Sequence, residues 1–174
     1  MIVVCGALAA GGTRPADIAR GAVVTGAGVQ LVGVVPDDDD GDRSLIELAQ
    51  SGVGHAAVLR EPRRTLEPAD LDLALRYLPE VRVVVLVEMP VAVVGVASDR
   101  AAWTGAALVV IGGAMVDGPT LDLPADATVL KAPESDPDGT FAGFVGAFAA
   151  RLDAGETPAD AWAATTSALA VDPV

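Results

Sequence analysis

Few side chains in this sequence could act as a nucleophile, a strong base or a soft metal ligand. The 174 residues contain one lysine, one histidine and one cysteine, which are Lys131, His55 and Cys5. A zinc site of several His or Cys ligands cannot be built from single copies, and a thiol enzyme would rest on one distant Cys–His pair. Carboxylates are abundant by contrast, with 24 Asp and Glu against 11 Lys and Arg. The chemistry left open is therefore carboxylate acid–base chemistry, including phosphoryl transfer.

The densest carboxylate group is the run of four aspartates at positions 37–40. Aligned as a calcium loop, this run would start at Pro36, whose side chain offers no ligand oxygen. Aspartates that follow a strand and precede a helix also cap the helix and favour the positive end of its dipole. We therefore predict helix capping here, and no metal site.

A second acidic stretch, SDPDGTF, precedes a helical segment near the C-terminus. The backbone amides at a helix start form an anion site, and Gly139 and Thr140 lie where this helix should begin. A phosphotransferase would place a carboxylate in the first turn to accept the proton of the acceptor hydroxyl. The pattern also fits an ordinary capped helix, so the two interpretations stay open at this level.

The elements that must position these groups alternate along the chain. Short β-branched runs predict strands at 2–5, 29–35, 56–60, 81–87, 107–111 and 128–130. Segments of helical period predict helices at 15–25, 43–51, 68–77, 98–104, 140–152 and 157–170. Most of the strands are apolar throughout, as in parallel sheets that helices cover on both faces. We predict one α/β domain over residues 1–174, a three-layer sandwich with a mostly parallel central sheet.

Charge limits the partners of the chain. The formal net charge is −13 and the isoelectric point is about 4.2. A nucleic-acid partner would require a basic surface, so none is expected, and no apolar run is long enough for a membrane span. A single cysteine forms no disulfide within the chain and fits a cytoplasmic location. We expect a small molecule or another protein as the partner.

Several segments, in order along the chain, resemble the PfkB carbohydrate kinases of the ribokinase-like superfamily. DPDGTFAGFVGAFAARLDAG resembles the family segment D-x-x-G-A-G-D and the helix that follows it, and ADAWAATTSALAV resembles the next, alanine-rich helix. Earlier, GGTRPADIARGAVVTGAGV and QLVGVVPDDDDGDRSLIELAQSGVGHAAVLREP resemble the Gly-Gly helix and the following strand–helix unit of the family. The resemblance implies a ribokinase-like fold.

The match departs from the family at the catalytic motif. In the family the last Asp of G-A-G-D is the base, and its glycines contribute to the anion hole. Here Gly139 matches the first glycine, Thr140 and Phe141 replace the next two residues, and Ala142 occupies the base position. A shifted match places Phe144 there instead. Neither match supplies a carboxylate, which leaves Asp136 and Asp138 as substitute candidates.

The substrate and nucleotide sides are also reduced. On the substrate side, Gly11 and Gly12 match the Gly-Gly pair of the family, and Asp17 replaces its asparagine. Family members carry a β-stranded lid before this pair, and residues 7–10 are too few to form one. On the nucleotide side, Gly112 and Gly113 resemble a glycine turn near the adenine site. The resemblance keeps ATP and Mg²⁺ as candidate cofactors, and no cofactor is predicted outright.

These departures favour a catalytically inactive, lidless family member that acts as a ligand-binding, regulatory or structural module. The alternative is an active ATP-dependent kinase for a sugar or nucleoside, with a relocated base. Loss of the lid predicts a homodimer through a strand edge or through the helices that carry Trp103 and Trp162. The two tryptophans are expected to be core or interface residues.

Overall fold

The computed structural model describes residues 1–8, 13–61, 65–112 and 123–170. Its strands form one six-stranded sheet in the order β3-β2-β1-β4-β5-β6, and all five strand pairings are parallel. The strands are β1 (Ile2–Ala7), β2 (Val29–Val35), β3 (Gly54–Arg60), β4 (Val83–Val87), β5 (Ala107–Ile111) and β6 (Thr128–Leu130). The predicted α/β class and parallel sheet are confirmed.

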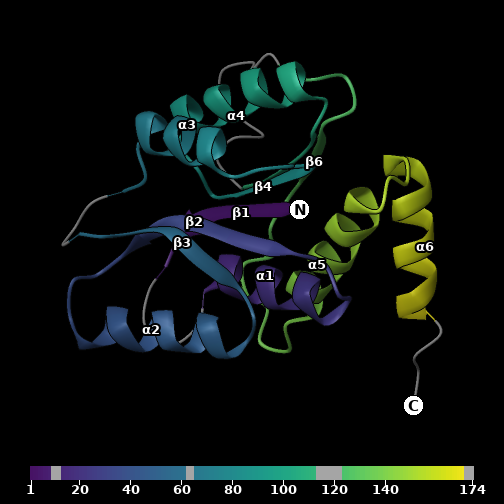
Figure 1. Ribbon diagram of the computed structural model, residues 1–174. Helices are drawn as coiled ribbons and strands as arrows, with labels where there is room; N and C mark the ends of the chain where they lie inside the picture. Colours follow the sequence, from purple (N-terminus) through teal and green to yellow (C-terminus); the bar gives the residue numbers. More distant parts are fainter. Residues whose placement is uncertain (9–12, 62–64, 113–122, 171–174) are drawn as a thin grey trace.

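The helices cover both faces of this sheet (Figure 1). They are α1 (Arg14–Val24), α2 (Asp39–Gln50), α3 (Pro68–Tyr77), α4 (Val91–Thr104), α5 (Thr140–Asp153) and α6 (Pro158–Ala170). Helices α1, α2 and α5 lie on one face, and α3 and α4 lie on the other, while α6 packs outside α5. The core is correspondingly divided into two apolar clusters, one on each side of the sheet.

The central strands are apolar because both of their faces are buried. Every residue of β4 is buried, and β1 and β2 are buried over nearly their whole length. Strand β3 lies at the edge of the sheet, and most of its residues are only partly buried. This is the arrangement that the continuous apolar runs predicted.

Two helices begin at least four residues earlier than the sequence predicted. Helix α4 starts at Val91 rather than at 98, because its buried face, including Val93 and Val94, packs on the sheet and outweighs the low helix propensity of β-branched residues. Helix α2 starts at Asp39 rather than at 43. The Asp38 carboxylate accepts the N–H groups of Asp40 and Gly41 at 3.1 and 3.0 Å, so the expected capping role is confirmed.

Helices α1 and α5 approach closely enough to require glycine at their contact. A Cβ on Gly146 would lie 2.6 Å from the Ala22 nitrogen and 2.7 Å from the Ile18 oxygen. Gly21 faces Gly143 across the same contact, where its Cβ would lie 3.2 Å from the Gly143 Cα. The close packing fixes α5 on α1 and so holds the start of α5 at the carboxyl end of the sheet.

The chain order reverses between β1 and β4. Strand β1 is followed by α1 on one face of the sheet, and β4 is followed by α4 on the opposite face. In open parallel sheets a crevice forms at such a point, outside the carboxyl ends of the strands. The fold therefore indicates where a ligand site would lie.

Candidate functional site

A crevice of about 640 Å³ lies at this reversal point. It is bounded by the ends of β1 and β4, the start of α1 and the segment that follows β6. Its lining consists of Ala7, Thr13, Arg14, Pro15, Val87, Glu88, Ala132, Pro133 and Glu134. Three chain segments that are distant in sequence thus converge on one cavity with both polar and apolar lining residues.

Arg14 ties these three segments together. Its guanidinium donates to the Glu88 carboxylate and, at 2.7 Å, to the Pro133 carbonyl oxygen. The Arg14 side chain is only 18% exposed, so most of its surface is removed from water. Arg14 and Glu88 thus place one positive and one negative charge in the wall of the crevice, and the two charges cancel.

Glu88 has an unusual backbone conformation at the end of β4. Its φ is +54°, in the left-handed region, although it is not glycine. Such a conformation costs on the order of 1–3 kcal/mol and is concentrated at functional sites. Its N–H donates to the Ile111 carbonyl at 2.7 Å, which anchors the bend to the neighbouring strand. The strained bend turns the chain at the crevice and presents the carboxylate to Arg14.

Thr13 contributes a polar group that is not used by the helix it precedes. It is the N-cap residue of α1, yet its side chain makes no capping hydrogen bond. Its Oγ1 is buried and has no hydrogen-bond partner among residues 1–8, 13–61, 65–112 and 123–170. A ligand or water in the crevice could satisfy this hydroxyl.

The start of α5 is occupied by a carboxylate of the chain itself. Gly139 forms the N-cap in the left-handed conformation, with φ +65°, which permits the sharp turn into the helix. The two carboxylate oxygens of Asp136 accept the N–H groups of Phe141 at 3.0 Å and Ala142 at 2.9 Å. Thr140 and Asp138 are exposed beside this turn. Two of the amides that could form an anion hole, those of Phe141 and Ala142, are therefore engaged by Asp136.

The position of Ala142 is unsuited to a catalytic base. Ala142 is 2% exposed and belongs to the core cluster that includes the α1–α5 contact. Phe144, the alternative base position, packs in an aromatic cluster with Phe148 and Trp162, with ring centroids 6.2 and 4.9 Å away. Both positions serve packing between helices.

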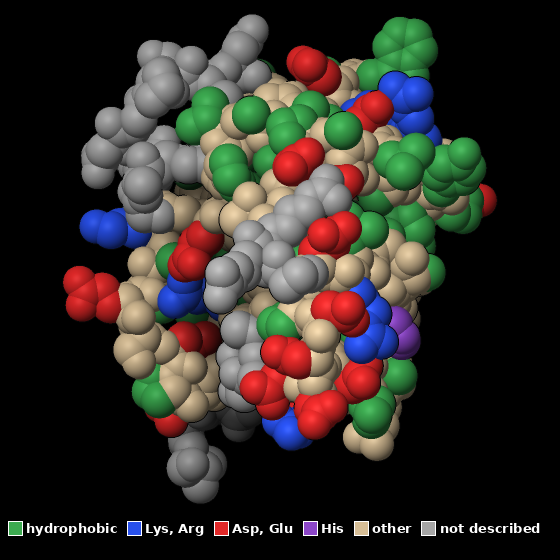
Figure 2. Space-filling view, turned by 90° about the vertical axis from the view of Figure 1, so that its left-hand side faces the viewer, with side chains coloured by type: hydrophobic (Ala, Val, Ile, Leu, Met, Phe, Trp, Pro, Cys, Tyr) green, Lys and Arg blue, Asp and Glu red, His purple; other side chains and the backbone are tan. Residues whose placement is uncertain are grey.

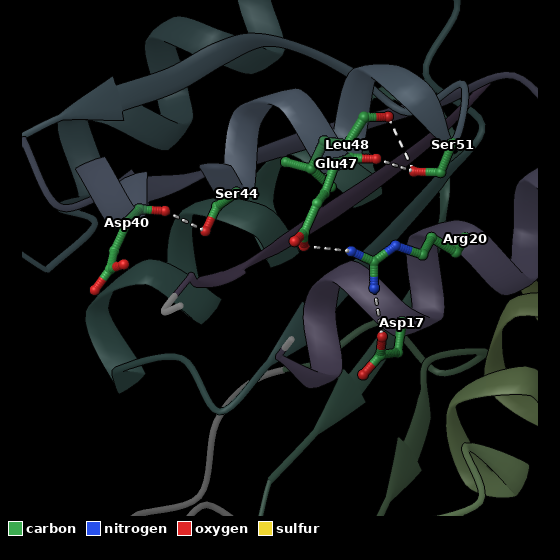
Figure 3. Close-up of polar contacts among 7 residues, drawn as sticks. All are labelled: Asp17, Arg20, Asp40, Ser44, Glu47, Leu48 and Ser51. Carbon is green, nitrogen blue, oxygen red and sulfur yellow. Dashed lines mark hydrogen bonds and ion pairs between the residues drawn. The ribbon is translucent and has the colours of Figure 1, made fainter. Parts of the chain in front are cut away.

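Asp17, predicted on the substrate side, lies outside the crevice lining. Its carboxylate accepts from Arg20 at 2.7 Å, and Arg20 also lies 3.6 Å from the Glu47 carboxylate of α2 (Figure 3). The three side chains link α1 to α2 on the surface. Gly11 and Gly12 lie outside the described residues.

On the nucleotide side, Gly112 directly follows β5. It is buried, and its N–H donates to the Leu130 carbonyl at 3.2 Å, so it extends the pairing between β5 and β6. Gly113 lies outside the described residues. Gly112, the residue of the predicted glycine turn that the structure describes, therefore takes part in the pairing of β5 with β6.

Acidic side chains gather on the face of the molecule toward which the strands run. Figure 2 views the side toward which the strands run, and red carboxylates gather in its lower half. The aspartates 37–40 and Asp42 at the start of α2 contribute to this face, together with a few arginines such as Arg43 and Arg60. A surface of this sign repels polyanions and attracts cations.

No group of three or more His, Cys, Asp or Glu side chains that could hold a metal ion occurs among the described residues. In the same part of the chain, none of the helices has the length and apolar character needed to cross a membrane.

The sequence reasoning missed Arg14 and Glu88. Both are charged residues that directly follow a buried strand or its connecting loop, which is a usable signal for a site at the carboxyl edge of a sheet. Their pairing, and the contact of Arg14 with Pro133, could not be read from spacing, because 74 and 119 residues separate the partners.

Comparison with known proteins identifies relatives in structure only. No family model and no curated protein sequence matches the chain. The crystal structure of Sa239 matches with a TM-score of 0.65 at 13% identity, over 99% of this chain and 97% of that one. A "putative Ribokinase II" from E. coli matches at 0.66 and 12%, over 94% and 90% of the two chains. Fructokinase from Xylella fastidiosa matches at 0.52 and 15%, over 86% of this chain and 57% of its own.

The chain therefore has a ribokinase-like fold, as its motifs predicted. Another crystal structure of the E. coli protein contains ATP and Mg²⁺. At these identities the likeness extends to the fold alone.

Proposed function

We propose that the chain is a ribokinase-like domain, over residues 1–174, that binds a small polar molecule in the crevice without transferring a phosphoryl group. The observation that carries the proposal is the bidentate cap of Asp136 on the N–H groups of Phe141 and Ala142. The cap fills the position where an anion would be stabilised during phosphoryl transfer.

The environment of Ala142 supports the absence of a base. Phosphoryl transfer to an alcohol uses a carboxylate that accepts the hydroxyl proton within hydrogen-bond reach. A carboxylate at position 142 would be buried in the apolar contact between α1 and α5, where an unpaired charge is strongly unfavourable. The packing of the two helices thus opposes a base at this position.

The alternative function is an ATP-dependent kinase for a sugar or nucleoside in which Asp136 or Asp138 serves as the base. Each carboxylate oxygen of Asp136 already accepts one backbone N–H, so a substrate hydroxyl would have to approach a lone pair that these bonds leave open. Asp138 is exposed at the turn and would act without the shelter of a closed site.

The crevice also suits some ligands better than others. Arg14 and Glu88 neutralise each other in its wall, the Thr13 hydroxyl has no partner among the described residues, and carboxylates gather on the surrounding face. A nucleoside triphosphate with Mg²⁺ fits poorly, since the amides at the start of α5 are engaged and the surrounding field is negative. Uncharged polar or cationic molecules, of the size of a sugar or nucleoside, are the ligand class we propose.

The test combines calorimetry with a phosphoryl-transfer assay on the full chain. Sugars, nucleosides and ATP with Mg²⁺ are titrated in turn, and transfer from ATP is measured with each acceptor. We expect an acceptor-type molecule to bind without turnover, and Arg14→Met to weaken that binding while Arg43→Met, a change on the exposed start of α2, leaves it intact. Turnover that disappears in Asp136→Asn would establish the kinase alternative instead.

We also propose that the chain forms a homodimer and lies in the cytoplasm. The cytoplasmic location remains a prediction from the cysteine count. For the homodimer, we propose the edge of the sheet as the contact.

A further inference from the structure

Strand β3 forms an open edge of the sheet. Among the described strands it pairs with β2 alone, and an edge strand presents alternate N–H and C=O groups on its outer side, with which another strand can pair. The register shifts once, between Gln30 and Val32 of β2, and is regular from Ala57 to Arg60 of β3. The opposite edge strand, β6, has only three residues. Strand β3 is therefore the longer edge at which the sheet could continue.

Strand β3 has few of the features that prevent an edge strand from pairing with another chain. Proline and lysine are absent from its sequence, GHAAVLR. Its one permanently charged residue, Arg60, is bound to Asp42 at 2.6 Å and to Asp37 at 3.3 Å. Apart from Arg60, the regular part of the edge thus consists of small and apolar side chains.

An apolar groove of about 410 Å³ runs between β3 and α3. Its lining is Ala56, Ala57, Leu59, Asp70, Leu73, Ala74, Tyr77 and Leu78. Leu73 and Tyr77, one helical turn apart on α3, are 56% and 79% exposed. Figure 2 shows hydrophobic side chains gathered at its right, above the histidine of β3. Two large apolar side chains beside an open strand edge indicate an interaction surface.

We propose that a second copy of this chain docks on the β3 edge, with the two β3 strands antiparallel about a twofold axis perpendicular to the sheet. Such an axis keeps corresponding helices on the same face, so α3 lies beside the α3 of the partner. Leu73 and Tyr77 of each copy then cover the groove of the other. The contact is isologous and closes as a dimer.

Charge favours a second copy at this surface. Two chains that each carry −13 repel one another wherever carboxylates are dense. Asp70 is the one carboxylate in the groove lining, and it belongs to the capping box of α3. The antiparallel arrangement also places the two acidic runs at 37–42, which lie beyond the carboxyl end of β3, at opposite ends of the interface. A basic partner would instead prefer those acidic runs.

The proposed dimer requires neither a bound ligand nor catalysis, and a measurement of the oligomeric state tests it. Sedimentation velocity over a concentration series of the full chain should show a monomer–dimer equilibrium. Leu73→Lys and Tyr77→Lys should each raise the dissociation constant by at least about tenfold, since buried aromatic and aliphatic anchors dominate such contacts. Trp103→Lys, on α4 and 84% exposed in the monomer, is the matched control and should leave the constant unchanged.

A second readout reports on the strand itself. Hydrogen exchange of the amides at 56–59 should slow as the protein concentration rises, and circular dichroism should confirm that the variants are folded. A monomer at every concentration overturns the proposal. A dimer that resists both lysine substitutions on α3, or one that is lost in Trp103→Lys or Trp162→Lys, also overturns it, because the contact then lies elsewhere.

Discussion

Asp136 caps α5 by accepting the backbone N–H of Ala142 at 2.9 Å, six residues further along the chain. The contact joins Asp136, a candidate for a relocated base, to Ala142, which the resemblance to the PfkB kinases places at the base position. It makes the carboxylate a structural part of the helix start. The first prediction tests this assignment.

Asp136→Ala should destabilise the protein by about 1 kcal/mol, the typical cost of losing a helix cap. The two N–H groups at the start of α5 would lose their acceptor. Urea denaturation followed by circular dichroism measures the effect. Asp138→Ala, at an exposed carboxylate of the same turn, should change the free energy of unfolding by less than about 0.5 kcal/mol. Equal effects of the two substitutions would contradict the capping role.

Two glycines of α5 should respond in opposite directions to alanine. In Gly146→Ala the new Cβ meets the α1 backbone at 2.6–2.7 Å, and overpacking of this kind costs about 1–3 kcal/mol. In Gly143→Ala the Cβ meets nothing within 4 Å, so the gain in helix propensity should stabilise the protein by about 0.5–1 kcal/mol. Thermal unfolding of both variants, compared with the wild type, measures the two shifts. A neutral Gly146→Ala would show that the helices can separate at no cost.

Removing the Arg14 side chain should loosen the crevice. Arg14→Met retains much of the apolar stem but loses the hydrogen bonds to Glu88 and Pro133, so we expect a loss of about 1–3 kcal/mol. Hydrogen exchange should become faster in the segment at 131–136, which the guanidinium holds. Arg43→Met removes an exposed pair with Asp40 and should cost less than about 1 kcal/mol. An unchanged exchange rate at 131–136 would argue against the tether.

Cys5 should make stability fall at alkaline pH. Burial raises the pKa of the Cys5 thiol from 9.0 to about 12, so the folded state keeps its proton over a range in which the unfolded state loses it. Below about pH 8 the thiol is almost entirely neutral in both states and has little effect. Above pH 9 the unfolded state binds fewer protons, and the free energy of unfolding should decrease by up to about 1.4 kcal/mol per pH unit.

Comparison with Cys5→Ala isolates this contribution. The alanine variant should be less stable at pH 7 because it leaves a small cavity. Its deficit should shrink between pH 9 and 10.5 as the wild type loses stability. A deficit that stays constant with pH would mean that the thiol ionises equally in both states.

Much of the fold follows from local pattern. The runs of Val, Ile and Leu at 29–35, 83–87 and 107–111 can be buried on both faces only in a helix-covered parallel sheet. Glycines at 26, 52 and 105 mark turns after helices, and each has positive φ in the structure. The start of α4 could not be predicted, because Val91 to Val96 has the composition of a strand and becomes helical through its packing. Trp103 was expected in a core or an interface, and its 84% exposure excludes the core of the monomer.

The sequence alone determined the class of the fold, the order of its elements and the absence of a carboxylate at position 142. These properties depend on residue type, on the period of the apolar pattern and on order along the chain. Only the tertiary structure decided that Asp136 faces into α5, that Ala142 lies against α1 and that Arg14 joins Glu88 to Pro133. Such contacts depend on how crossover helices pack on the sheet, since packing brings together side chains whose separation in sequence carries no information about their distance.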